Sequence, residues 1–255
     1  MEIEPQTRRY FLALSFEGTA YHGWQVQPNA VTVQSVLESA LKMLLRQPVS
    51  LTGAGRTDTG VHARSYTAHF DYTANPLDPQ QLIYKLNSIL PADIAVHSLN
   101  EVSSEAHARY SALWREYEYI ICTQKDPFLI NKAWRMEREL NLDAMQQAAS
   151  LLLEFQDFEC FSKSNTQVNN YLCQIMEAHW RKEGHQLIFS IRANRFLRNM
   201  VRAIVGTLTD VGLGKITLND LVRIIESKNR SKAGYSVPGC GLYFMGAAYP
   251  PEIFT

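Results

Sequence analysis

A glycine-rich run around one aspartate contains the residues of this chain that are best suited to chemistry. It reads Gly53-Ala54-Gly55-Arg56-Thr57-Asp58-Thr59-Gly60-Val61-His62-Ala63. The glycines allow a tight turn and a close approach of the backbone to a ligand. Arg56 stands two residues before Asp58, and a nearby cation favours the ionised carboxylate. The pattern therefore indicates a nucleophile or general base at Asp58, although the same residue types also form ordinary turns.

Other motifs built from glycine and aspartate fit this run less well. A dinucleotide fingerprint needs a third glycine where Arg56-Thr57-Asp58 stand, and a P-loop needs a following Gly-Lys-Ser or Gly-Lys-Thr. Asp58-Thr59-Gly60 does spell the D-T-G of aspartic proteases, which need two carboxylates that share a proton. The chain has no second such motif, so a protease would require a symmetric dimer, and Arg56 would oppose the shared proton. Both features count against this interpretation.

Two further segments combine arginine with aromatic residues. Residues 192–202 contain four arginines and no acid, and a helix over 195–211 would place Arg195, Arg198 and Arg202 on one face. Such a face suits phosphate groups, although an exposed helix face is the simpler interpretation. On a strand over 114–122, Tyr117 and Tyr119 would share one side. They would either stack on unpaired bases or pack within a sheet.

The periodicity of apolar residues predicts an α+β protein with antiparallel sheets. Helices are expected after the caps Thr32, Asp78, Asn141 and Thr217, in addition to the one over 195–211. The expected strands are 9–16, 49–52, 65–72, 94–99, 114–122, 171–181, 186–193 and 242–249. The pattern loosens between 103 and 109, which predicts an N-terminal domain over 1–106 and a C-terminal domain over 107–255.

Composition narrows the classes of function. The net charge is zero, which argues against a uniformly basic surface but not against a local basic groove. The four cysteines show no C-x-x-C spacing and the histidines form no ligand pair, so we expect no metal and reduced thiols. The early apolar run, 11–16, is too short for a signal peptide or a membrane span. We therefore expect a cytoplasmic protein that does not bind membranes.

Taken together, the motifs of this chain resemble the tRNA pseudouridine synthase A family. The matching residues span nearly the whole chain and occur in the order of the family. They are Gly18-Thr19, Tyr21-His22-Gly23-Trp24-Gln25, Thr32-Val33-Gln34, Gly53 to Ala63, Arg115-Glu116-Tyr117-Glu118-Tyr119, Asn194, Phe196, Met200-Val201-Arg202, Gly206 and Gly241-Leu242-Tyr243.

This resemblance implies a fold and an activity. The fold would be α+β, with two similar halves, each an antiparallel sheet with helices packed on it, and a basic cleft between them. The activity would be the isomerisation of uridine to pseudouridine in the anticodon stem-loop of tRNA, at positions 38 to 40, without any cofactor. Members of the family are typically homodimers. A non-catalytic RNA-binding protein is the alternative.

The resemblance also implies roles for particular residues. Asp58 would be the nucleophile, Arg202 its ion-pair partner, and Tyr117 the ring that stacks on the flipped base. The expected contacts with tRNA are Arg56, Arg195, Arg198 and His22. Tyr119, His62 and Trp24 are expected to be mainly structural. Glu116 and Glu118 depart from the family, which often has basic residues there, and this bears on the strength of tRNA binding.

Overall fold

The computed structural model describes residues 6–163 and 169–254 of the chain. These residues form two compact units. Unit 1 comprises the described residues up to Leu113 together with those from Phe244 onward, and unit 2 runs from Trp114 to Tyr243. The predicted domains, 1–106 and 107–255, stay a prediction, and the compact units follow a different division because the end of the chain lies in unit 1.

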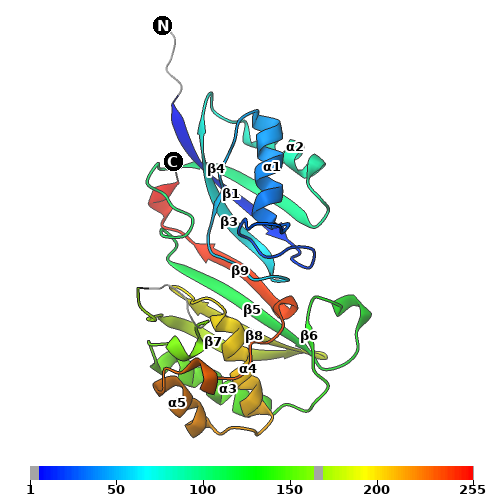
Figure 1. Ribbon diagram of the computed structural model, residues 1–255, viewed down its shortest axis with the longest axis vertical. Helices are drawn as coiled ribbons and strands as arrows, with labels where there is room; N and C mark the ends of the chain where they lie inside the picture. The colour runs from blue at the N-terminus through cyan, green and yellow to red at the C-terminus, as the bar shows by residue number, and fades with distance from the viewer. Residues whose placement is uncertain (1–5, 164–168, 255) are drawn as a thin grey trace. The chain divides into compact units, whose positions relative to one another are not determined.

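Unit 1 is a mostly antiparallel sheet with two helices (Figure 1). Its central strand β1 pairs antiparallel with β3 on one side and with β4 on the other, while β2 and β9 both lie beside β3. Helices α1 and α2 lie next to each other. The bounds are β1 Thr7–Phe16, α1 Val33–Leu45, β2 Thr52–Gly53, β3 His62–Thr73, α2 Pro79–Ile89, β4 Ile94–Val102 and β9 Leu242–Ala248, whose first two residues belong to unit 2.

Residue types explain the helices and the main core of unit 1. Thr32 caps α1 in a capping box with Ser35, and Asp78 caps α2 just before Pro79. These two caps confirm the sequence prediction. Along β1 every second side chain from position 10 to position 16 is buried, as expected for one face of a strand.

The opposite face of β1 carries a second, smaller core. Phe11, on this face, clusters with Val102, Ala106 and Ala108, and two side chains near the C-terminus pack against the cluster. These are Tyr249 and Ile253. The segment that follows β4 therefore lies against the sheet and is held there by residues from the end of the chain.

Unit 2 is an antiparallel sheet, β5–β8–β7, with the short β6 parallel to β5, and three helices (Figure 1). The predicted mixed α+β class with antiparallel strands is confirmed. The bounds are β5 Trp114–Cys122, β6 Trp134–Arg135, α3 Leu142–Leu151, β7 Ile175–Glu183, β8 Gln186–Ala193, α4 Met200–Gly212 and α5 Leu218–Glu226. None of the helices in the described ranges has both the length and the apolar character needed to cross a membrane.

The structure corrects two predicted elements. Helix α4 begins at Met200 and not at residue 195, because Asn199 has a left-handed backbone with φ of 68°. Arg195 and Arg198 therefore precede the helix, and the predicted three-arginine helix face is wrong. The strand expected over 49–52 is reduced to Thr52–Gly53, because the side chains of Glu38 and Gln34 on α1 bond the backbone N–H and C=O of Leu51.

Candidate active site

The loop that carries Asp58 is a tight turn. The backbone N–H of Val61 donates to the carbonyl oxygen of Asp58 at 3.2 Å, and Gly60, the third residue of the turn, has φ of 74°. A positive φ at that position is what a type II turn requires. Asp58 is half-buried and Arg56 is exposed. The loop thus carries a carboxylate at the start of the turn and a guanidinium two residues before it.

The segment from Gly18 to Gly23 lies directly against this turn. A Cβ atom on Gly23 would stand 2.2 Å from the carbonyl oxygen of Thr57, and one on Gly18 would stand 2.0 Å from that of Val61. Gly23 also has φ of 85°, which side-chain-bearing residues rarely adopt. Only glycine at these two positions allows the backbone to approach the Asp58 loop so closely.

Two buried aromatic side chains support the start of the loop. The Trp24 and Tyr66 rings pack with their centroids 4.3 Å apart, and the Tyr66 hydroxyl donates to the carbonyl oxygen of Gly55. A Cβ atom on Gly53 would stand 2.2 Å from that hydroxyl. The position of Trp24 in the core is consistent with the structural role predicted for it.

His62 and His22 lie in contrasting environments. His62 is buried, and its Nδ1 accepts a hydrogen bond from the Gly18 N–H at 2.9 Å. The Glu17 carboxylate lies 3.3 Å from the same nitrogen, but a nitrogen that accepts from Gly18 has no proton to donate to Glu17. The His22 side chain is exposed, and its residue directly precedes Gly23, which touches the Thr57 carbonyl.

In unit 2, Tyr117 on β5 is almost buried and faces a second ring. Phe196 meets it edge-on, with centroids 5.1 Å apart and planes at 86°. Phe196 is one of the residues that match the family, but its contact with Tyr117 cannot be read from the sequence because the two residues lie far apart in the chain. Arg115, on the same side of the strand, donates to the carbonyl oxygen of Asn194 at 2.8 Å. Tyr119 is fully buried and donates to Pro238, and burial raises the pKa of its hydroxyl, which agrees with a structural role.

The three predicted basic residues near α4 occupy different positions. Arg202 lies in the first turn of α4, half-buried, and its Nε donates to the carbonyl oxygen of Val237 at 2.7 Å. Arg195 donates to Asn170 at 3.3 Å, and Arg198 is exposed. The arginines thus come from a loop and a helix start, not from one helical face.

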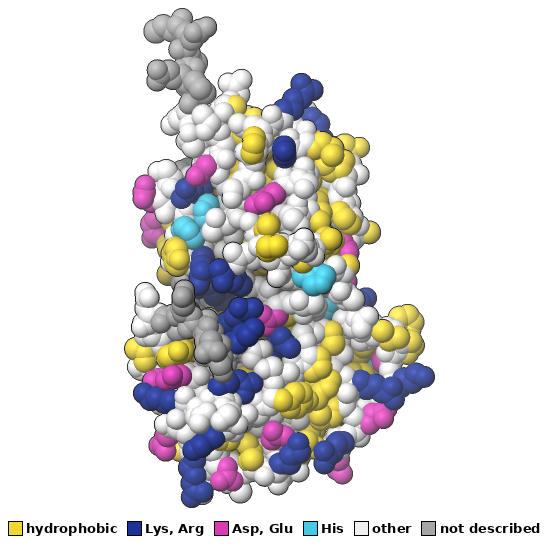
Figure 2. Space-filling model, viewed as in Figure 1, with side chains coloured by type: hydrophobic (Ala, Val, Ile, Leu, Met, Phe, Trp, Pro, Cys, Tyr) yellow, Lys and Arg dark blue, Asp and Glu magenta, His cyan; other side chains and the backbone are white. Residues whose placement is uncertain are grey.

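The two glutamates that flank Tyr117 are ion-paired within unit 2. Glu118 accepts from Arg181 at 2.8 Å, and Glu116 contacts Arg192 at 3.1 Å. Side chains alternate along a strand, so both glutamates point to the side opposite Tyr117. Acidic and basic side chains are also interspersed over the part of Figure 2 that is unit 2. The departure at Glu116 and Glu118 therefore does not place negative charge beside the Tyr117 ring.

Comparison with known proteins decides the family. The family described as tRNA pseudouridine synthase matches residues 12–111 and 148–250. The chain belongs to the tRNA pseudouridine synthase A family. A tRNA pseudouridine synthase A of Bacteroides fragilis is 48% identical over 248 residues, which cover 97% of this chain and 98% of the relative. The enzyme of that name from Porphyromonas gingivalis is 46% identical, over 96% of this chain and 99% of the relative. The one from a Thermoanaerobacter species is 42% identical, over 95% of this chain and 100% of the relative.

Family membership confirms the prediction of a tRNA pseudouridine synthase, an isomerase that acts on tRNA. It leaves the roles of individual residues to be tested. Unit 1 holds Arg56 and Asp58 on one loop, with His22 just before the glycine that supports it. Tyr117 and Arg202 belong to unit 2. In the described ranges, no group of three or more His, Cys, Asp or Glu is arranged to hold a metal ion.

Proposed function

We propose that this chain converts uridine to pseudouridine in the anticodon stem-loop of tRNA, at positions 38 to 40, with Asp58 as the reacting carboxylate. The observation that carries the proposal is the loop of Asp58. Its backbone is fixed by the turn to Val61 and by the close approach of Gly23 and Gly18. A carboxylate held in this way is positioned before substrate binds, which is what covalent and acid–base catalysis require.

The reaction requires access to a base that is stacked inside the stem-loop. The target nucleotide must therefore turn out of the stack, at a cost of a few kcal/mol. Arg56 is exposed two residues from Asp58, so it is placed to contact the RNA backbone as the base leaves. His22, Arg195 and Arg198 are proposed as further tRNA contacts. Phosphate contacts by arginine side chains supply a large part of the affinity for nucleic acid.

Three routes for the carboxylate remain open in the proposal. Asp58 attacks carbon 1′ of the ribose, adds to carbon 6 of the base, or removes the 2′ proton to give a glycal. In each route the bond from N1 to the ribose breaks, the base turns, and carbon 5 bonds to carbon 1′. Each route needs an ionised carboxylate, which an arginine partner stabilises. We propose Arg202 for that partner.

Tyr117 completes the proposed site. Its ring is supported edge-on by Phe196, so its orientation is fixed before the base arrives. We propose that it stacks on the flipped uracil and assists removal of the proton from carbon 5 in the last step. None of these steps changes the redox state of the substrate.

Replacement of Asp58 tests the proposal directly. Wild type and the variants D58A and D58N are compared on tRNA transcripts with uridine tritiated at carbon 5, since the new bond at carbon 5 expels that hydrogen. Wild type should release tritium and both variants should release none. D58N should bind tRNA within about 3-fold of wild type, because phosphate contacts dominate affinity.

Other results would change the conclusion. Tritium release by D58N at the wild-type rate would exclude Asp58 as the reacting group. Binding of tRNA without any release by wild type would favour the alternative, a non-catalytic RNA-binding protein. A homodimer stays a prediction drawn from the family.

A further inference from the structure

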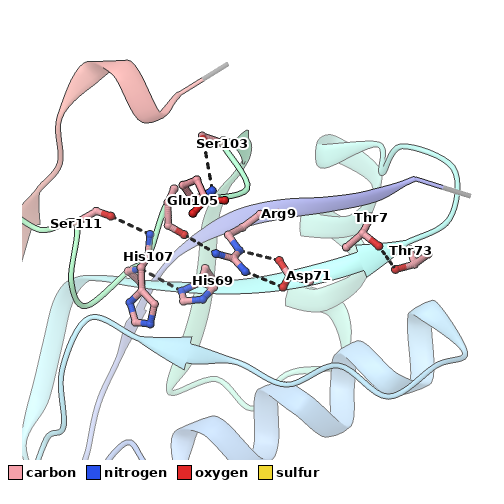
Figure 3. Close-up of polar contacts among 11 residues, drawn as sticks. Thr7, Arg9, His69, Asp71, Thr73, Ser103, Glu105, His107 and Ser111 are labelled. Carbon is pink, nitrogen blue, oxygen red and sulfur yellow. Dashed lines mark hydrogen bonds and ion pairs between the residues drawn. The ribbon is translucent and has the colours of Figure 1, made fainter.

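The segment that follows β4, residues 103–111, is fixed on the sheet of unit 1 by several polar contacts. Arg9 forms a two-point ion pair with Asp71, at 2.7 and 2.8 Å, and also donates to the carbonyl oxygen of Ala106 at 3.0 Å. Arg9 and Asp71 are directly opposite each other on β1 and β3. Figure 3 shows the Arg9 side chain between Asp71 and this segment.

Two histidines hold the backbone of the same segment. Nδ1 of His69 accepts from the Ala108 N–H at 3.1 Å. Nδ1 of His107 accepts from the N–H groups of Arg109 and Tyr110, at 3.1 and 3.2 Å. The two imidazole rings lie close together, with centroids 4.7 Å apart (Figure 3). Since Tyr249 also donates to the Ala108 carbonyl, the backbone from 106 to 110 is held at nearly every residue.

This rigid segment presents two side chains to solvent. Tyr110 is 75% exposed although its ring packs on that of His107, with centroids 4.4 Å apart. The exposed Arg109 places its guanidinium carbon 5.5 Å from the centroid of the Tyr110 ring. The ring thus packs on His107, has the Arg109 guanidinium over it, and keeps most of its surface open.

We propose that Arg109 and Tyr110 bind one unpaired nucleotide of the RNA, with its base stacked on the Tyr110 ring and its phosphate on the Arg109 guanidinium. This inference rests on the proposed function, because tRNA is the substrate considered there. Aromatic rings next to cations are the usual means of binding unpaired nucleotides, and stacking accepts any base. A platform whose backbone is already fixed loses little entropy when the nucleotide docks.

Replacement of Tyr110 in the full chain tests the stacking contact, with Y84A as the matched control. Tyr84 lies on α2 of the same unit and is 74% exposed, so its loss removes an equally exposed ring. Y110A should raise the Kd and the KM for a tRNA transcript about 5- to 100-fold while kcat changes less than about 2-fold. Y110F and Y110W should stay within about 3-fold of wild type because both keep a ring, and Y84A should match wild type.

Replacement of Arg109 tests the phosphate contact through the salt dependence of tRNA binding. R109Q should lower the slope of log Kd against log salt concentration by about 1, since one phosphate contact is lost. K85Q, which removes an exposed cation of α2, should leave the slope unchanged. Equal slopes for R109Q and wild type would remove Arg109 from the proposal.

The outcomes separate this inference from the proposed function. Normal tritium release together with unchanged Kd and KM in Y110A would overturn the inference alone. A loss of tRNA affinity in Y110F as large as that in Y110A would also overturn it, because the proposed stacking uses the ring and not the hydroxyl. If wild type released no tritium but Y110A still weakened tRNA binding, the proposed function would fall and the nucleotide site would stand.

Discussion

At the scale of single residues, the position of Asp58 depends on a residue that bears no functional group. Gly23 touches the peptide between Thr57 and Asp58, and a Cβ atom there would stand 2.2 Å from the Thr57 carbonyl oxygen. Real Cβ atoms rarely approach closer than 3.0 Å, so G23A must move the loop by about 1 Å. A displacement of that size can lower the rate about 100-fold. We expect kcat for tritium release to fall by about this factor while the Kd for tRNA is nearly unchanged.

Variants at two other glycines distinguish a displaced Asp58 loop from a general effect of replacing glycine. Gly55 lies on the same loop with open space around it and no positive φ, so G55A should keep wild-type kcat. Gly184 has φ of 58° and open space, so G184A should lower stability through backbone strain but leave kcat intact. A Kd that rose as much as kcat fell in G23A would contradict a role in positioning.

At the scale of elements, residues 103–111 depend on histidines that remain neutral. Burial, the neighbouring His107 and Arg9 lower the pKa of His69 to about 4, and burial with Arg9 lowers that of His107. Asp71 opposes the shift of His69 without reversing it. Only a neutral imidazole can accept a hydrogen bond at Nδ1. The stability that these rings provide is therefore fully present above the pKa of an unfolded histidine, about 6.5.

Acidification should weaken this segment in a defined pH window. A histidine whose pKa is lowered by folding destabilises the folded state as pH falls from about 6.5 to the folded value, because the unfolded chain binds the proton first. The free energy of unfolding should therefore decline between about pH 6.5 and 4. In H69N the amide oxygen can accept from Ala108 without titrating, so the decline should be smaller. H97N, which replaces an exposed histidine of β4, is the control, and its free energy of unfolding should decline as in wild type. An equal decline in H69N would show that His69 does not cause the loss of stability.

Local sequence signals located most elements but not every boundary. The caps Thr32 and Asp78 lie next to the helices that they start, so both starts could be predicted. The start of α4 could not, because the left-handed Asn199 is held by a contact with Ser236, 37 residues away in the chain. The predicted arginine helix face failed for this reason, and no motif within 195–202 reveals it.

At the scale of the whole molecule, features built from contiguous residues could be predicted from the sequence, whereas features built from distant residues could not. The Asp58 loop could be recognised because its residues are contiguous and of unusual types. The support of residues 103–111 could not, since Arg9, His69 and Tyr249 come from three distant parts of the chain and are ordinary residues taken singly. The compact units also divide the chain differently from the predicted domains, since the described residues from Phe244 onward belong to unit 1.

That return of the chain brings its last strand against Tyr66, a residue that supports the Asp58 loop. Phe244 is fully buried, and its ring centroid lies 5.1 Å from that of Tyr66, whose hydroxyl holds Gly55 at the start of the loop. F244A should lower the free energy of unfolding by about 3–5 kcal/mol, measured by denaturant titration, because it leaves a cavity. F254A is the control, since Phe254 is 44% exposed and its loss removes less buried surface. Equal losses in the two variants would show that the C-terminal strand does not support the Asp58 loop through Tyr66. A larger loss in F244A, with tritium release falling at temperatures where F254A is still active, would support a dependence of the Asp58 loop on the last strand.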